Sequence, residues 1–382
     1  MIGVGAGAGR AAWVVIGVML LAGVLRAGEA DLIKNGDFKD GTSGWSELAS
    51  DADREAAVVD FEGGKALKLA RKTAKAAAQA VQYNLKLKPQ TLYRLSVTGK
   101  GDTRAVVSLR PSSSKDKDYF KLCKSWATSA APLDPSKDLA TETLLFDAGQ
   151  KADSAFLALR LDGEAPGTYQ VTSVALTEVG GTKADKSELV IAHLGDSITI
   201  TSYLPFSQRV DALLQAAIQK AFPNLRTRQL NLAADGEFVK ELFDTKRYDQ
   251  YMKENYDKID VAIIRYGGND QPRYSADEFK KLLNALCDNL IRDYPGITIV
   301  LGTGTCLNAA GDINKKYGPY WQATRDLANE RKFLLADVYR RFEKEASPKT
   351  AKAEGDMHPS AFGVKLTAEV EYETLEAVLK AR

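Results

Sequence analysis

The sequence predicts two domains, an all-β sandwich followed by a three-layer α/β/α domain with a parallel five-stranded sheet. Up to about residue 179, short alternating stretches are separated by Gly, Pro, Asp and Ser, which is typical of antiparallel strands and turns. From about residue 188, apolar strand candidates alternate with longer amphipathic periods. That alternation indicates a parallel sheet with helices on both faces. The chain has 382 residues, which is enough for two such domains.

The first 28 residues have the pattern of a secretory signal peptide. Arg10 supplies a positive charge, residues 11–25 are apolar, and small residues follow at 27–30. The apolar run is shorter than the ~20 residues of a membrane-spanning helix. We therefore expect removal of residues 1–28, a secreted or periplasmic protein, and no stable membrane span afterwards. An uncleaved anchor stays open as the alternative.

The segment 31–179 carries the strand candidates of the sandwich. The clearest are residues 66–69, 93–97, 155–159 and 167–176. One stretch, residues 71–80, is rich in Ala and Lys and is also compatible with a helix. We place the domain boundary in the polar segment 180–187.

Residues 188–382 make up the predicted α/β domain. Strands are expected near 189–194, 228–232, 260–265, 297–302 and 333–337. Helices are expected near 205–222, 276–294, 317–331 and 361–380, each with apolar residues at helical spacing.

Composition excludes several functions. The formal charge is +2 and no basic face is clustered, so we expect no nucleic-acid partner. There are three cysteines, Cys123, Cys287 and Cys306; they cannot all pair within one molecule, and a bridge between the last two stays open. With only two histidines and no suitably spaced ligand cluster, we expect no metal and no cofactor.

A candidate nucleophile stands at the end of the first predicted parallel strand. The apolar run 189–192 leads into Gly195-Asp196-Ser197. Ligands of open α/β sheets bind outside the carboxyl ends of the strands. The same tripeptide also suits an ordinary surface turn, so the assignment depends on the segments that follow.

Three further segments stand in the same kind of place. Residues 231–236 (Asn-Leu-Ala-Ala-Asp-Gly) and 266–270 (Tyr-Gly-Gly-Asn-Asp) follow strand candidates, and residues 355–363 (Gly-Asp-Met-His-Pro-Ser-Ala-Phe-Gly) precede the last helix. Together with the serine segment, their order resembles the four blocks of the SGNH hydrolases, the GDSL esterase/lipase family. The resemblance covers roughly residues 188–382 and implies the three-layer fold of that family.

The resemblance implies a serine mechanism. Ser197 would be the nucleophile, and a serine hydroxyl needs a base within hydrogen-bond reach. Of the two histidines, His193 lies inside the strand before Ser197, where alternation points it away from the site, so we interpret it as a packed strand residue. His358 stands in the His-Pro-Ser-x-x-Gly context of the family and is the expected base.

The resemblance also implies a three-donor oxyanion hole. Its donors would be the Ser197 N–H, the Gly236 N–H and the side-chain amide of Asn269. Each such donor is worth ~10²–10³ in rate. Taken singly, the glycine also suits a turn and the asparagine a strand end.

The acidic partner of the histidine departs from the family pattern. The acid normally stands three residues before the histidine, and here that position is Gly355. Asp356 stands at minus two and Glu354 at minus four. We favour Asp356 as the residue that orients the imidazole, with Glu354 as the alternative and a Ser–His dyad also open.

The N-terminal domain resembles jelly-roll carbohydrate-binding modules. The opening Asn-Gly-Asp-Phe at 35–38 with Gly-Trp at 44–45, and the closing segment 169–176, carry this resemblance. Exposed aromatic rings would serve sugar binding, and the candidates are Trp45, Tyr83, Tyr119, Phe120 and Trp126. Since Trp and Tyr are also common in cores, none is assigned as a ligand.

We therefore expect an exported serine esterase that removes acetyl or other small acyl groups, with an acylated carbohydrate or another ester as its partner. The alternatives are a lipase, phospholipase or thioesterase on lipid esters, a glycan O-acyltransferase, and a glycan-binding protein with an inactive hydrolase domain. Because the four blocks all follow the polar segment, residues 188–382 are expected to fold alone and to hydrolyse a small ester.

Overall fold

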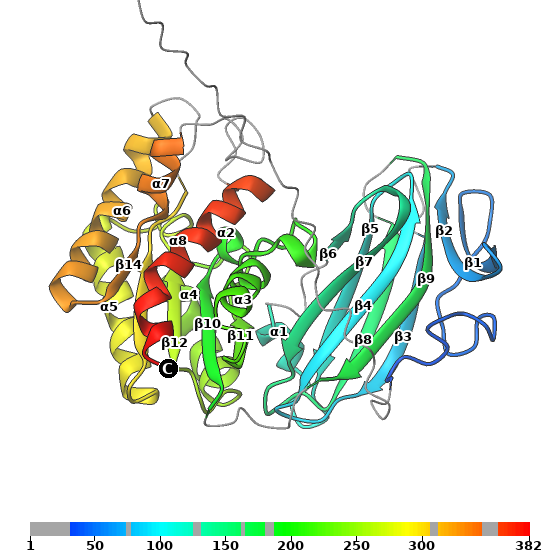
Figure 1. The fold of residues 1–382 in the computed structure, drawn as a ribbon, viewed down its shortest axis with the longest axis horizontal. Helices are drawn as coiled ribbons and strands as arrows, with labels where there is room; N and C mark the ends of the chain where they lie inside the picture. The colour runs from blue at the N-terminus through cyan, green and yellow to red at the C-terminus, as the bar shows by residue number, and fades with distance from the viewer. Residues whose placement is uncertain are drawn as a thin grey trace, which may run out of the picture.

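The computed structural model describes residues 31–73, 78–124, 131–161, 165–179, 187–305, 312–345 and 358–382. A β-sandwich and an α/β domain lie side by side in it (Figure 1). The predicted signal peptide and nearly all of the polar segment 180–187 fall outside the described residues, as does Cys306.

Two antiparallel sheets form the sandwich, as predicted. One sheet has the strand order β1-β2-β9-β4-β7 and the other has the order β3-β8-β5-β6. Their bounds are β1 Arg54–Phe61, β2 Gly64–Arg71, β3 Gln79–Lys86, β4 Leu92–Gly101, β5 Ala105–Ser112, β6 Ala131–Leu133, β7 Ser136–Asp147, β8 Ser154–Leu161 and β9 Gly167–Glu178. The four clearest strand candidates lie within β2, β4, β8 and β9.

The alanine- and lysine-rich stretch 71–80 is not a helix at either end. Arg71 ends β2, and β3 already begins at Gln79. Residues 74–77 lie outside the described part. Both ends of the stretch belong to strands that pack in the core, since Leu69 and Ala80 are fully buried between the sheets.

The Asn-Gly-Asp-Phe…Gly-Trp opening forms a loop of the sandwich that its own hydrogen bonds hold together. Asn35 has a left-handed backbone (φ 51°) and its side-chain amide donates to the carbonyl oxygens of Gly41 and Ser43. The ring of Trp45 packs against that of Phe38 at 5.4 Å, and its indole N–H donates to the Asn35 carbonyl. Trp45 is therefore a buried loop anchor rather than an exposed sugar platform.

The second domain contains the five-stranded parallel sheet that the sequence predicts. Its order is β11-β10-β12-β13-β14, with β10 Leu189–Gly195, β11 Thr227–Asn231, β12 Val261–Arg265, β13 Thr298–Gly302 and β14 Leu334–Ala336. The chain places β11 on one side of β10 and β12 on the other. Such a reversal of strand order opens a crevice at the carboxyl end of β10.

Helices cover both faces of this sheet (Figure 1). One face is covered by α3 (Val210–Ala221), α7 (Val338–Glu345) and α8 (Ala361–Lys380), and the other by α4 (Val239–Asp244), α5 (Ala276–Asp293) and α6 (Asp312–Arg331). The three-layer prediction is confirmed. The two short helices α4 and α7 were not predicted, because six to eight residues show too little periodicity.

The helix expected over 205–222 begins later, at Val210. Pro205 and Arg209 both have an extended backbone, and residues Phe206–Gln208 form a separate 3₁₀ turn, η1, between them. Phe206 is buried there at the junction with the sandwich. A tertiary contact thus overrides the helical pattern at this end.

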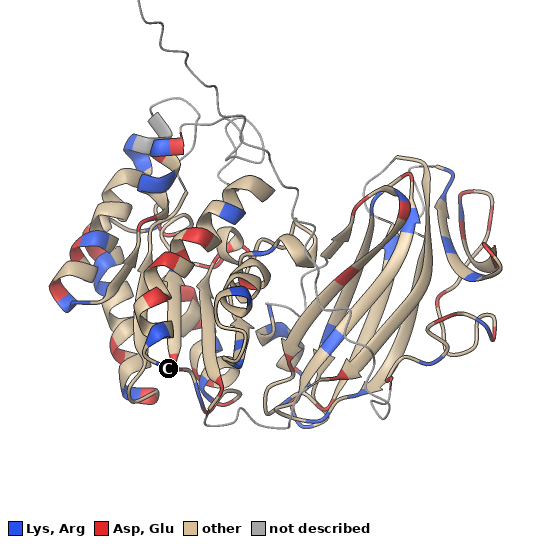
Figure 2. Ribbon diagram, viewed as in Figure 1, with Lys and Arg blue, Asp and Glu red and all other residues tan. Residues whose placement is uncertain are grey.

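Charged residues of both signs are mixed over the outer surfaces of the helices, and no face of a single sign is visible in Figure 2. This distribution agrees with the nearly balanced composition. In the described part of the chain, no helix combines the length and the apolar character needed to cross a membrane.

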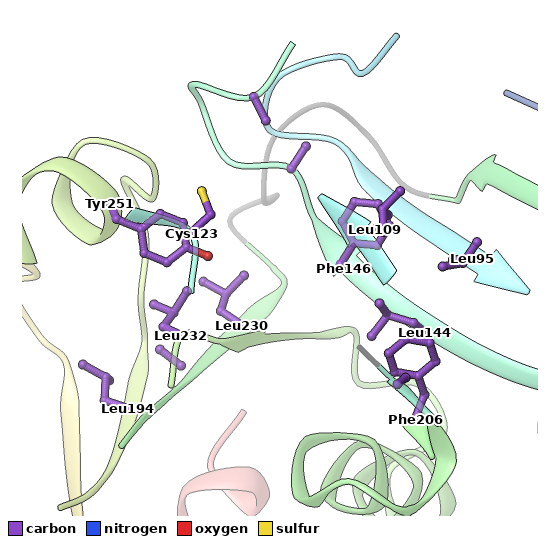
Figure 3. Close-up of a cluster of buried hydrophobic side chains, with 14 of the residues drawn as sticks. Leu95, Leu109, Cys123, Leu144, Phe146, Leu194, Phe206, Leu230, Leu232 and Tyr251 are labelled. Carbon is purple, nitrogen blue, oxygen red and sulfur yellow. The ribbon is translucent and has the colours of Figure 1, made fainter. Parts of the chain in front are cut away.

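Apolar side chains from both domains pack together at their junction (Figure 3). Leu144 of β7 lies next to Phe206, Phe146 of the same strand belongs to the same cluster, and Leu230 of β11 lies close to Cys123 of the sandwich. All five are buried. One continuous core therefore runs through both domains.

A buried ionic triad also joins the two domains. Arg228 on β11 pairs with Asp147 at the end of β7 and donates to the Glu188 carboxylate at 3.0 Å. All three residues are less than a tenth exposed. Without the sandwich, the α/β domain would expose its apolar junction residues and the Arg228–Glu188 pair to water. We therefore expect residues 188–382 to be less stable alone than the polar segment before them suggested.

We predict that Arg228→Met lowers the free energy of unfolding by about 3–5 kcal/mol, because Asp147 and Glu188 then remain as buried, uncompensated charges. Urea unfolding followed by fluorescence measures the loss. Lys65→Met is the control, since the Lys65–Asp60 pair is exposed and its removal should hardly change the free energy of unfolding. Equal effects of the two substitutions would contradict the importance of this triad.

Candidate active site

Strand β10 delivers the candidate nucleophile to the crevice. Every residue of β10 is buried, and the strand ends at Gly195. A Cβ atom there would lie 2.2 Å from the hydroxyl oxygen of Thr199 and 2.4 Å from the carbonyl oxygen of Arg265. Only glycine therefore allows the chain to turn at this point directly into the residue that carries the hydroxyl, Ser197.

Asp196 shapes the turn. Its backbone is extended and its carboxylate accepts from the N–H of Ile198 at 3.0 Å, which caps the single helical turn α2 (Ser197–Ile200). Ser197 is the first residue of α2 and is half-buried. The serine thus sits at the carboxyl end of β10, at the start of α2.

The structure brings Ser197 and His358 together. The distance from Ser197 Oγ to His358 Nε2 is 2.9 Å, a hydrogen-bond distance. Tyr203 packs edge-on against the imidazole at 5.3 Å, and its hydroxyl donates to the carbonyl oxygen of Pro359 at 2.8 Å. Ser360 then caps α8 by accepting from the N–H of Gly363. The histidine is therefore held from both its ring face and its backbone.

Both candidate acids, Asp356 and Glu354, lie outside the described residues. Their order of preference stays a prediction from the sequence. Within the described ranges, no three side chains of His, Cys, Asp or Glu are grouped in a way that suits a metal ion.

His193 is buried away from the serine, as expected. It is fully buried, its Nε2 lies 2.8 Å from the side-chain oxygen of Gln229, and its Nδ1 lies 4.0 Å from the carboxylate of Glu371 on α8. These contacts place its ring on the α8 face of the sheet. The interpretation of His193 as a packed strand residue is confirmed.

Gly236 lies in the loop that follows β11. The N–H of Glu237 donates to the carbonyl oxygen of Ala234 at 3.2 Å, which closes a tight turn with Gly236 at its third position (φ 75°). A positive φ at that position favours glycine. The N–H of Ala234 donates to the carbonyl of Gly195 at 3.0 Å, so this loop runs along the end of β10.

Asn269 follows β12 and reaches the same place. Its amide nitrogen lies 3.2 Å from a carboxylate oxygen of Asp196 and 3.3 Å from the carbonyl oxygen of Glu237. The side chain thus joins the nucleophile turn to the loop of Gly236. These contacts place the Asn269 amide beside the turn that carries Ser197.

Two buried carboxylates, neither of them predicted as a site residue, hold these loops in place. Asp270 accepts from the N–H groups of Val239 and Gly267 at 3.0 and 3.1 Å. Glu237 pairs with the guanidinium of Arg247 and accepts from the Tyr266 hydroxyl at 2.8 Å. Burial raises the pKa of Asp270 to about 6, although its two N–H donors lower it.

A polar rim surrounds the strand-end loops. The Ser202 hydroxyl donates to the exposed carboxylate of Asp235 at 3.0 Å. On the other side, the exposed guanidinium of Arg273 lies 4.3 Å from the ring of Phe238 and donates to the carbonyl oxygen of Asn269. These hydroxyl, carboxylate and guanidinium groups make the surroundings of the site polar.

The sequence contained a signal for only some of these residues. Asp196 and Asp270 stand inside the recognised segments, next to the residues that were assigned. Arg247 and Tyr203 stand outside every segment, and an arginine or tyrosine at those places has no distinguishing pattern. Their contacts exist only in the folded chain.

Two family models match the chain. The model of the GDSL-like lipase/acylhydrolase family matches residues 193–366. The C-terminal domain is a GDSL-like acylhydrolase. It is a carboxylic ester hydrolase of the SGNH type. The serine and the histidine in contact, Ser197 and His358, both lie in this domain. A carbohydrate-binding domain model matches residues 30–161, which correspond to the sandwich.

Similar solved structures cover either the hydrolase half or most of the chain. An acetylxylan esterase from Geobacillus stearothermophilus is 19% identical, with a TM-score of 0.42, over 50% of this chain and 96% of its own. An α/β hydrolase enzyme from the metagenome of Lake Arreo, Spain, is 21% identical, with a TM-score of 0.42, over 51% and 97%. A Bacillus subtilis protein is 16% identical, with a TM-score of 0.47, over 91% and 93%. Among curated proteins, none matches this sequence.

We predict a pH-dependent effect of Asp196→Asn on stability. Burial raises the pKa of Asp196 to about 7 from an ordinary value of 3.8. The folded protein therefore binds this proton more tightly than the unfolded chain, and this carboxyl makes stability fall as pH rises from about 4 to about 7. Asparagine is neutral throughout and keeps an oxygen that can accept from Ile198.

The free energy of unfolding of Asp196→Asn, measured against the parent by urea titration at pH 4, 5, 6 and 7, should shift steadily in favour of the variant. Asp138→Asn, a change at an exposed position, is the control and should show no such trend. A difference that stays constant with pH would refute the raised pKa.

Proposed function

We propose that this chain is an exported serine esterase that removes acetyl or another small acyl group from a carbohydrate. The observation that carries the proposal is the 2.9 Å contact between Ser197 Oγ and His358 Nε2 at the carboxyl end of β10. A hydroxyl at this distance from an imidazole nitrogen can transfer its proton as it attacks an ester carbonyl. Export rests on the signal pattern of residues 1–28.

In the first half of the reaction, Ser197 Oγ bonds to the acyl carbon while His358 Nε2 takes the hydroxyl proton. The carbonyl oxygen becomes an oxyanion, and its donors would be the N–H groups of Ser197 and Gly236 and the amide of Asn269. His358 then protonates the leaving sugar oxygen as the carbon–oxygen bond breaks. The acid that orients His358 is proposed to be Asp356, with Glu354 as the alternative.

In the second half, a water molecule replaces the sugar. His358 takes a proton from the water as its oxygen attacks the acyl carbon, and the same donors hold the second oxyanion. Collapse of this intermediate breaks the bond to Ser197 Oγ and returns the proton to the serine. The products are a free carboxylic acid and the parent enzyme, so no cofactor is required for the balance.

Two observations support a carbohydrate as the acyl carrier. The sandwich matches a carbohydrate-binding domain model, and the rim of the active site presents Ser202, Asp235 and Arg273. Hydroxyl-rich substrates are bound through such polar groups together with aromatic faces.

Of the five aromatic candidates in the sandwich, Tyr83 is the one whose described side chain is exposed (48%). Its ring lies 5.8 Å from that of Phe156, and the guanidinium of Arg110 lies 5.7 Å from the Phe156 ring. Trp45 and Tyr119 are buried. Trp126 and the side chain of Phe120 lie outside the described part. Tyr83 is therefore the proposed sugar contact on the sandwich.

The test is acetate release from acetylated xylan, pectin, chitin and peptidoglycan. We predict release from at least one of these polymers, and its loss in Ser197→Ala by a factor of ~10⁶ in turnover with the fold unchanged. Circular dichroism and the unfolding midpoint check the fold. Activity of the variant within tenfold of the parent would remove Ser197 from the mechanism.

Further arms of the experiment separate the alternatives. Tyr83→Ala should leave hydrolysis of 4-nitrophenyl acetate unchanged while weakening retention on the polymer. Faster hydrolysis of 4-nitrophenyl laurate than of the acetate would favour a lipase, and acyl transfer to added sugar in excess of hydrolysis would favour an acyltransferase. Polymer binding without any ester hydrolysis would indicate an inactive hydrolase domain.

A further inference from the structure

Arg247 is a fully buried cation at the junction of the two domains. Nη1 donates to both carboxylate oxygens of Glu237 at 2.6 and 2.8 Å, and Nη2 donates to the carbonyl oxygen of Leu232 at 2.7 Å. Nε donates to the carbonyl oxygen of Leu122 at 2.8 Å. Leu122 belongs to the sandwich domain, whereas the other two partners belong to the hydrolase domain.

The two hydrolase partners of Arg247 stand at the two ends of one loop. We call residues 232–237 the oxyanion loop, because Gly236 lies within it and the carbonyl oxygen of Glu237 contacts the amide of Asn269. A single planar guanidinium therefore holds the beginning and the end of the loop. Tyr266 supports the same end through its hydrogen bond to Glu237. Two of the three proposed oxyanion donors depend on where this loop lies.

The third side of the guanidinium is satisfied by the sandwich. Leu122 ends α1 (Tyr119–Leu122), a short helix that the chain inserts between β5 and β6. Tyr119 fixes α1 on the hydrolase domain, since its ring packs 6.4 Å from that of Tyr251 and its hydroxyl donates to Asn255 at 3.4 Å. The Tyr251 ring in turn lies 5.1 Å from the guanidinium.

Figure 3 shows Tyr251 and Cys123, the residue after α1, next to Leu230 and Leu232 at the base of the oxyanion loop. Cys123 and Tyr251 are fully buried. The sandwich therefore supplies packing and a hydrogen-bond acceptor directly below the oxyanion loop.

We infer that Arg247 is a positioning residue through which the sandwich domain holds the oxyanion loop in its catalytic geometry. The inference rests on the proposed esterase function. Oxyanion donors stabilise the developing charge only when they are fixed in advance, and a displacement of a fraction of an ångström weakens them. The sandwich is thus part of the catalytic apparatus even for a substrate that contains no sugar.

The first test is Arg247→Lys in the full chain. Lysine keeps a positive charge against Glu237 but replaces the planar fork with a single point donor. We expect kcat on 4-nitrophenyl acetate to fall 10- to 100-fold, with KM changed less than threefold. The affinity for phenylboronic acid, which becomes a tetrahedral anion on the serine, should fall by a similar factor. If Arg247 served only stability, the substitution would change the unfolding midpoint but leave the kcat and the boronate affinity of the folded enzyme unchanged.

The second test approaches from the sandwich side. Tyr119→Leu keeps an apolar side chain but removes the ring and hydroxyl that fix α1, and we expect a kcat loss of 5- to 20-fold with the same loss of boronate affinity. The matched control is Lys151→Met, which removes another side-chain ion pair between the domains, with Glu254, and keeps the backbone N–H that donates to Asn255. Its kcat should stay within twofold of the parent.

A folded Arg247→Lys with kcat within twofold of the parent would overturn the inference, as would a kcat loss with unchanged boronate affinity. If Arg247→Lys does not fold, the kcat and the boronate affinity of Tyr119→Leu decide instead, by the same criteria. Ser197→Ala shows whether a negative result contradicts the positioning role of Arg247 or the proposed esterase function. A parent whose ester hydrolysis does not depend on Ser197 contradicts the esterase itself, whereas a Ser197-dependent parent with an indifferent Arg247 contradicts only the positioning role.

Discussion

The buried Glu237–Arg247 ion pair is the interaction on which the arrangement of the active site depends most. A buried charge is expensive unless its partners are complete, and Arg247 is completed only when the loop after β11 and helix α1 of the sandwich are both in place. The same ion pair fixes Glu237, whose carbonyl oxygen contacts Asn269. Satisfying one guanidinium therefore brings together two domains and two of the catalytic loops.

Around this pair, the parallel sheet supplies the remaining geometry. Strands β10, β11 and β12 end side by side, so that Ser197, Gly236 and Asn269 emerge at one edge. Small or buried residues make the close approach possible: Gly195 leaves room for the turn, and Asp196 caps the helix of the serine. The base arrives from the opposite end of the sequence, on the loop before α8. An ester hydrolase follows from this convergence, and the carbohydrate substrate is proposed from the second domain.

Much of this could be predicted from the sequence, and the exceptions have physical reasons. Apolar runs were enough to predict the sheet, and the resemblance of the four segments pointed to Ser197 and His358, which the fold brings into contact. Arg247, Glu237 and Asp270 were not predicted, because their partners are side chains and backbone groups that only the fold brings close. The start of α3 was misplaced since Phe206 packs into the domain junction. The polar segment 180–187 suggested two independent domains, whereas the buried junction joins them through apolar packing and an ion pair.

In the proposed mechanism, Ser197 is a nucleophile activated by its surroundings. The most direct measurement is peptide mapping by mass spectrometry after treatment with diisopropyl fluorophosphate, which reacts with activated serines. We expect one adduct per chain, located on Ser197, and none when the protein is unfolded before treatment. An adduct on another residue, or no adduct on the folded protein, would contradict it.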